Sequence, residues 1–125
     1  MRYVLPAAFL ALAAASPAFA TGGFICSPVN GKGPVISLVI GHGSPGGGVI
    51  GAALKEGGRW RSTMQPEVPL ILKRATMDRQ RTAVDLVHRR TGAPEAQLRV
   101  RNRGFGGTGT LVRKGRTYQV RCRQD

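Results

Sequence analysis

Apolar and polar residues alternate in short runs along most of this chain, and glycine-rich turns separate the runs. Alternation with a period of two is typical of β-strands that bury one face and expose the other. No segment shows a helical period over the length of a helix. The pattern predicts strands over 24–29, 35–40, 49–55, 59–64, 70–76, 82–88, 97–103, 108–113 and 117–123. One short helical turn is expected at 93–96, because Pro94 suits the first position of a helix.

The clearest turn signal is Lys114-Gly115, which lies between two alternating runs. A two-residue hairpin loop at this point sets Leu111 opposite Tyr118 and residue 112 opposite residue 117. This register puts Leu111, Tyr118, 120 and 122 on one face of the hairpin. Positions 119, 121 and 123 then share the other face.

A second turn signal is the segment 56–58, which contains two glycines. A three-residue loop would pair Leu54 with Trp60, whereas a two-residue loop would pair Leu54 with Arg61. We favour the three-residue loop because it matches two apolar side chains on one face. The prediction therefore directs Trp60 toward the core.

Residues 1–20 have the composition of a secretory signal peptide. Arg2 gives a positive start, an apolar stretch follows over 3–15, and small residues precede Ala20. The stretch is shorter than the roughly 20 apolar residues that a membrane-spanning helix requires. We expect cleavage near Ala20, export to the periplasm or the exterior, and a single β domain over 21–125 without a transmembrane segment.

The two cysteines lie near the two ends of the predicted domain. Cys26 belongs to the first predicted strand and Cys122 to the last. Exported proteins meet an oxidising compartment, so we expect a disulfide between them. Closing a loop of about 100 residues stabilises a fold by up to about 4.7 kcal/mol in the chain-entropy model. A redox-active pair would have a closer spacing, such as Cys-x-x-Cys.

The strand count and the cysteines together indicate a fold. Eight or nine short antiparallel strands joined by hairpins are typical of an up-and-down β-barrel, or alternatively of a β-sandwich. A disulfide between the first and last strands makes these strands neighbours, and neighbouring end strands close a barrel. We therefore favour the barrel.

The predicted strand 35–40 is apolar on both faces. Val35 and Val39 lie on one face, and Ile36, Leu38 and Ile40 lie on the other. A loop that covers the outer side explains this pattern without any partner, and we favour it. The alternative is an exposed apolar strip that forms a homodimer through this strand.

Two segments, 41–46 and 104–109, match the dinucleotide-binding pattern G-x-G-x-x-G. That chemistry requires a helix that starts at the glycines, and neither segment precedes a run of helical length. We interpret both as loops, so no cofactor is expected.

Catalytic and metal sites are not expected either. The chain has only 2 histidines and 6 acidic residues. His42 lies in a glycine-rich segment that is poorly suited to hold a nucleophile in place. The acids lie mostly near arginines, which indicates ordinary surface pairing. The composition therefore predicts that the protein is not an enzyme and holds no metal.

Positive charge is the strongest remaining feature. The chain has 19 Lys and Arg against 6 Asp and Glu, a formal net charge of +13. Clustered cations concentrate anions near a protein, and the planar guanidinium suits phosphate and carboxylate groups. The candidate anion-binding residues are Arg59, Arg61, Arg99, Arg101, Arg103, Arg113, Lys114, Arg116, Arg121 and Arg123. A compositional bias toward arginine explains why the chain uses arginine rather than lysine. It explains less well why basic residues outnumber acidic residues.

These features indicate a binding protein. We expect an exported basic β-barrel that binds an anionic envelope polymer, a lipid headgroup or an acidic protein. Nucleic acid is not the expected partner, because few aromatic side chains are available to stack on bases. The alternative is a protein inhibitor or partner of an exported hydrolase.

Overall fold

The structure, a computed structural model, describes residues 22–41 and 48–124. Nine strands and no helix are present among these residues. The strands are β1 (Gly22–Pro28), β2 (Val35–Ile40), β3 (Val49–Glu56), β4 (Arg59–Ser62), β5 (Leu70–Met77), β6 (Arg81–His88), β7 (Pro94–Arg103), β8 (Gly106–Arg113) and β9 (Arg116–Gln124). The all-β prediction is confirmed, and every predicted strand overlaps an observed one.

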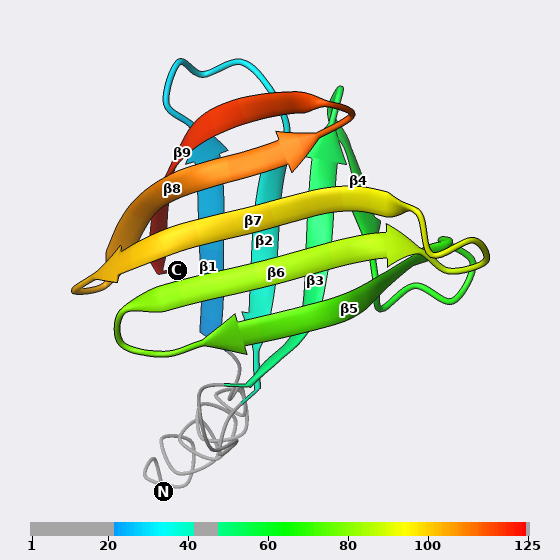
Figure 1. The fold of residues 1–125 in the computed structure, drawn as a ribbon, viewed down its shortest axis with the longest axis horizontal. Coiled ribbons are helices and arrows are strands. Elements are labelled where there is room, and N and C mark those ends of the chain that lie inside the picture. Colours follow the sequence, from blue (N-terminus) through cyan, green and yellow to red (C-terminus); the bar gives the residue numbers. More distant parts are fainter. Residues whose placement is uncertain (1–21, 42–47, 125) are drawn as a thin grey trace, which may run out of the picture.

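The nine strands form one antiparallel sheet in the order β4-β3-β2-β1-β9-β8-β7-β6-β5. Strands that follow each other in sequence pair with each other. The exception is β4 and β5, which lie at opposite ends of the sheet and do not pair. Figure 1 shows the sheet folded over on itself, so that β5–β8 cross in front of β1–β3 at a steep angle. The result is a nearly closed up-and-down barrel whose seam lies between β4 and β5.

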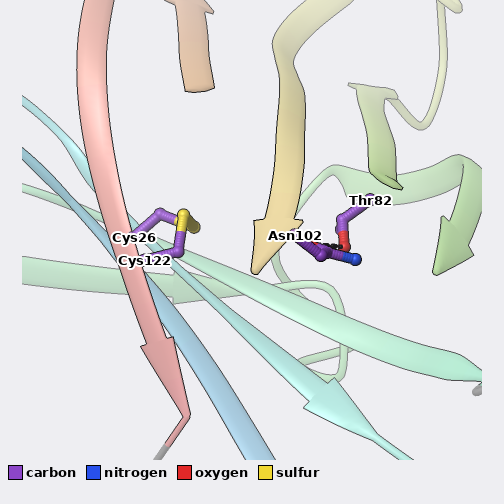
Figure 2. The surroundings of a disulfide bond; sticks show 4 residues. All are labelled: Cys26, Thr82, Asn102 and Cys122. Carbon is purple, nitrogen blue, oxygen red and sulfur yellow. Dashed lines mark hydrogen bonds between the residues drawn. A yellow bond between two sulfur atoms is a disulfide. The ribbon is translucent and has the colours of Figure 1, made fainter. Parts of the chain in front are cut away.

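A disulfide between Cys26 and Cys122 joins the first and last strands. The two residues are direct register partners on β1 and β9, although 96 positions separate them in sequence. Their side chains point into the barrel, where both cysteines are buried (Figure 2). The predicted disulfide and the predicted pairing of the end strands are therefore confirmed.

The barrel interior is filled by the apolar residues of the alternating pattern. Ile36, Leu38, Leu98 and Leu111 are fully buried, and Tyr118 packs against the same cluster. The predicted inward face of the β8–β9 hairpin is confirmed, because residues 111, 120 and 122 are buried while 119, 121 and 123 are exposed.

The hairpin loop at Lys114-Gly115 has the predicted length. Leu111 pairs with Tyr118, and residue 112 pairs with residue 117. Lys114 has φ +50° and Gly115 has φ +75°. Two successive residues with positive φ are the mark of a type I′ turn, which matches the twist of the flanking strands.

The prediction for the β3–β4 turn is wrong. Leu54 pairs with Arg61 and Lys55 pairs with Trp60, so the loop contains two residues rather than three. Gly57 and Gly58 both have positive φ, which allows a tight type I′ turn. Trp60 consequently points outward and is 45% exposed, with the Lys55 ammonium 5.7 Å from the centre of its ring.

Two further predictions of irregular structure are wrong. The segment 93–96 contains no helical turn, because β7 begins at Pro94, which is tolerated at the first position of a strand. The glycines that follow Phe105 lie in β8 rather than in a loop. A Cβ atom at Gly107 would lie 2.5 Å from the Arg101 carbonyl oxygen. Glycine therefore lets β7 and β8 approach closely. Residues 42–47, most of the other glycine-rich segment, lie outside the described residues.

The outer side of β2 is half-buried. Val35 and Val39 face outward, whereas Leu38 faces the core. Val39 pairs with Gly51, and Met64 lies over Gly51, with its Sδ 2.8 Å from the position of a Cβ at that glycine. Met64, just after β4, therefore covers the outer side of β3 at the position paired with Val39.

Candidate functional site

Arginines line up across the outer surface of β6, β7, β8 and β9; β6–β8 belong to the front layer in Figure 1, and β9 curves from its edge back toward β1. Arg81 on β6 is the register partner of Arg101 on β7. Thr108 on β8 continues the row and lies between Arg101 and Arg121 of β9. Neighbouring strands are about 4.8 Å apart, so the row spans about 15 Å.

A second row lies beside the first, nearer to the β7–β8 turn. Arg103 pairs with Gly106, which pairs in turn with Arg123. Arg99 lies on the other side of the first row, opposite Thr110. We call the six exposed arginines that point outward from these strands the arginine face. Its members are Arg81, Arg99, Arg101, Arg103, Arg121 and Arg123.

The surface is hollowed where short side chains lie between the arginines. A shallow groove of about 580 Å³ is lined by Arg74, Arg81, Arg99 and Arg101, by Asp78 at one side, and by small residues of β5, β6 and β8. The small residues are Thr76, Ala83, Thr108, Gly109 and Thr110. The groove therefore offers guanidinium and hydroxyl donors around an open floor, which suits an anionic group.

Most of the arginine face lacks compensating negative charge. Arg99 is the exception, with its Nη1 2.7 Å from Asp85 Oδ1 in an ion pair. The same Nη1 also donates to the Leu98 carbonyl at 2.8 Å. Within the described residues, the other five arginines of the face form no salt bridge. Arg81 has the Asp78 carboxylate nearby, and its charge helps to lower the pKa of that carboxyl. The other four arginines are exposed and can meet an external anion.

A network of hydrogen bonds fixes the turn that carries Arg81. Asp78 Oδ1 accepts from the backbone N–H groups of Gln80 and Arg81 at 2.7 and 2.8 Å. These bonds hold the pKa of the Asp78 carboxyl below its usual value. The Asn102 amide donates to the Asp78 carbonyl at 2.7 Å and accepts from the Thr82 hydroxyl at 3.0 Å (Figure 2). The turn is thereby tied to β7 beside Arg101.

Arg113 lies apart from the arginine face. It shares the inward side of Leu111 and is only 6% exposed. Its Nε and Nη2 donate to both carboxylate oxygens of Glu56 at 2.9 and 2.8 Å, and its Nη1 donates to Glu95 at 2.9 Å. Hydrogen bonding to the partner raises the pKa of Arg113 and lowers that of Glu56. The pairing neutralises this arginine, so it is not available to an external anion.

The remaining predicted residues lie elsewhere on the barrel. Arg61 is 4.0 Å from both Glu56 and Glu95 and so joins the Arg113 cluster. Arg59 is exposed at the edge strand β4, opposite Glu56. Lys114 and Arg116 are exposed at the β8–β9 turn. Five of the ten predicted residues therefore gather on the arginine face.

The sequence prediction omitted Arg81 and Arg74. Arg81 begins β6, one residue before the predicted strand. Its side chain points to the face opposite that of the buried Thr82 and Val84. Extending the alternation back by one position would have included it. Arg74 follows an irregularity in the β5–β6 register, between residues 72 and 74. No period-two pattern could have assigned it to this face.

Comparisons with protein-family models, curated proteins and solved structures find no match to this chain. Among the described residues, no three His, Cys, Asp or Glu side chains gather to hold a metal ion. The same part of the chain has no helix that is long and apolar enough to cross a membrane.

Proposed function

We propose that this protein is an exported, non-catalytic binding module whose arginine face binds an anionic component of the cell envelope. The observation that carries the proposal is the direct pairing of Arg81 with Arg101 on neighbouring strands. Like charges directly opposite each other destabilise a sheet. An anion bound between the two guanidinium groups removes that cost and makes the arrangement favourable.

The chemistry of the groove supports a phosphate or carboxylate ligand. Guanidinium groups bind both anions through two parallel hydrogen bonds, and the hydroxyl groups of Thr108 and Thr110 add neutral donors. The groove is open and continues into a second hollow beside Arg101 and Arg103. An extended polymer or a surface of repeated headgroups fits this shape better than an enclosed small molecule.

Export supports an envelope ligand. The composition of residues 1–20 is that of a signal peptide, and a disulfide is compatible with an oxidising compartment. An exported protein meets lipid headgroups and anionic wall polymers before it meets nucleic acid. Trp60, an aromatic residue suited to base stacking, lies on β4 rather than on the arginine face, and a single exposed aromatic side chain, Phe105, lies beside that face in the described residues.

Binding of sodium polyphosphate, a soluble polyanion, tests the proposal. The triple variant Arg81→Gln, Arg101→Gln, Arg121→Gln should bind at least tenfold more weakly than the parent at low salt. Its affinity should also change less with salt, because fewer close charge contacts remain to be screened. Isothermal titration calorimetry at two salt concentrations measures both effects.

The matched control is Arg59→Gln, Lys114→Gln, Arg116→Gln. It removes the same charge from exposed positions outside the arginine face, and it should retain most of the affinity. Equal losses in the two variants would show that only net charge matters and would overturn the proposal. A parent that does not bind the polyanion, but co-purifies with an exported hydrolase, would favour the inhibitor function.

A further inference from the structure

Phe105 is the most exposed large apolar residue described in this protein, at 82%. It lies at the tip of the β7–β8 hairpin, in a two-residue loop with Gly104, since Arg103 pairs with Gly106. Gly104 has φ +60°, which provides the tight turn. The turn does not require an aromatic residue. Leaving the Phe105 side chain exposed also forgoes the hydrophobic free energy that its burial would contribute to folding.

The tip is held firmly although its side chain is exposed. The Gln124 backbone N–H donates to the Phe105 carbonyl at 2.8 Å, which ties the turn to the end of β9. The glycines on either side have no side chains that could cover the ring. The phenyl group therefore projects from a rigid support.

Arginines surround this apolar tip. Arg103 precedes the turn, and Arg123 lies opposite Gly106 on β9. Arg79 and Asp78, in the β5–β6 turn at the same end of the barrel, line a cleft of about 690 Å³ that also reaches Gly104 and Gly106. Figure 1 shows the β5–β6 and β7–β8 turns projecting side by side at this end.

We propose that this end of the barrel docks on an anionic lipid bilayer, with the Phe105 ring inserted below the headgroups. The proposal rests on the proposed function and takes lipid headgroups as the source of the anion. Residues two apart on a strand are separated by about 7 Å. The headgroup layer of each leaflet is about 5 to 8 Å thick. When the ring reaches the hydrocarbon boundary, Arg103 and Arg123 lie among the headgroup phosphates.

The same spacing places the backbone of the next row of the face about 14 Å from the hydrocarbon boundary, outside the headgroup layer. Arg101 and Arg121 are two positions further from the tip than Arg103 and Arg123. A soluble polyanion would be bound by the arginines alone and would gain nothing from an exposed ring. A bilayer gains from both features, because it offers anionic headgroups beside a hydrocarbon layer.

Co-sedimentation with vesicles tests the proposal. The protein should bind vesicles of phosphatidylcholine with about one-third phosphatidylglycerol, and it should not bind pure phosphatidylcholine. Phe105→Ser should reduce partitioning about tenfold or more, because burying one phenyl group is worth at least that factor. The same variant should bind polyphosphate like the parent. Trp60→Ser, which alters an exposed aromatic residue of β4, is the matched control and should bind vesicles like the parent.

Fluorescence reports the depth of the ring directly. Trp60 is the only tryptophan of the chain, so Phe105→Trp in a Trp60→Phe background carries a single reporter at the tip. Its emission should shift to the blue on anionic vesicles, and brominated acyl chains should quench it. Unshifted emission from vesicle-bound protein would overturn the insertion.

The outcomes separate this inference from the proposed function. If Phe105→Ser binds anionic vesicles like the parent, the inference is wrong, while salt-dependent polyphosphate binding still supports the arginine face. If the parent binds neither probe, both proposals are wrong. Loss of single-stranded oligonucleotide binding in Phe105→Ser, without loss of vesicle binding, would assign the ring to base stacking instead.

Discussion

Arg113 binds both carboxylate oxygens of Glu56 across the barrel, although 57 positions separate the two residues in sequence. The pair joins the end of β8 to the end of β3, and Glu95 at the start of β7 completes it. Both layers of the barrel in Figure 1 are thereby connected at one end by ionic hydrogen bonds. The disulfide connects β1 and β9, so the two links act at different places in the sheet.

The first prediction concerns the loss of Arg113. Arg113→Ala leaves Glu56 and Glu95 without their shared donor, and breaking a buried pair typically costs 3–5 kcal/mol. Because a third of the Glu56 side chain is exposed, we expect a loss of about 2 to 3 kcal/mol in the free energy of unfolding. Urea denaturation at neutral pH measures it. A loss like that of Lys114→Ala, an exposed neighbour, would contradict the buried-pair account.

The second prediction concerns acid stability. The pKa of Glu56 is lowered in the folded protein from its ordinary value of 4.5. A lowered pKa stabilises the fold above the ordinary value, and this contribution is lost as pH falls below about 4.5 toward the folded pKa. Glu56→Gln should therefore be less stable than the parent at pH 7 and should lose less stability on acidification. Thermal melts between pH 7 and 3 test this, with the exposed Glu67→Gln as control.

The third prediction concerns the disulfide. Removing a native disulfide from a small exported domain typically costs about 2 to 5 kcal/mol. The double variant Cys26→Ala, Cys122→Ala should therefore melt at least about 10 °C below the oxidised parent. Its far-UV circular dichroism should remain that of a β protein, because β1 and β9 keep their hydrogen bonds. Equal melting temperatures for the oxidised parent and the double variant would contradict a stabilising role.

The fourth prediction concerns the glycines of β8. A Cβ atom at Gly109 would collide with the Arg99 carbonyl oxygen and with Val100 Cα, which are backbone atoms of β7. Gly109→Ala should therefore destabilise the barrel by about 1 to 3 kcal/mol, the range for overpacking. Thr110→Ala, which alters an outward position of the same strand, should change stability by less than about 0.5 kcal/mol. Urea denaturation compares them, and equal effects would contradict the close approach of β7 and β8.

The fifth prediction concerns the support of the anion site. Asn102→Ala removes the bonds that join Thr82 and Asp78 to β7. We expect faster amide hydrogen exchange at residues 78–81 and weaker polyphosphate binding, because the turn before Arg81 is then held to β7 by the Asn102 backbone N–H, which donates to the Gln80 carbonyl at 2.8 Å, without the side-chain bonds. The change should be smaller than for Arg81→Gln, which removes the charge itself. Unchanged exchange in the turn would show that Asn102 does not hold it.

Local patterns determined much of the fold. The period-two alternation identified all nine strands, and β2 has the predicted bounds. The short loop at Lys114-Gly115 fixed the β8–β9 register, because positive φ at two successive residues depends on local conformation alone. The two cysteines indicated the pairing of β1 with β9, since a disulfide requires close approach. Where a turn had two possible lengths, at 56–58, the pattern of apolar pairs favoured the wrong register.

Only the tertiary structure decided which arginines are free to bind. The period-two alternation indicates which neighbours on the same strand share a face with Arg99, Arg101 and Arg113. It correctly predicted that Arg99 and Arg101 point outward. It does not say that Glu56 and Glu95, from distant strands, meet Arg113 inside the barrel. Nor does it place Arg81 opposite Arg101, because their register depends on how β6 and β7 pair. Side-chain direction is a property of each strand, whereas charge compensation depends on which strands the barrel brings together.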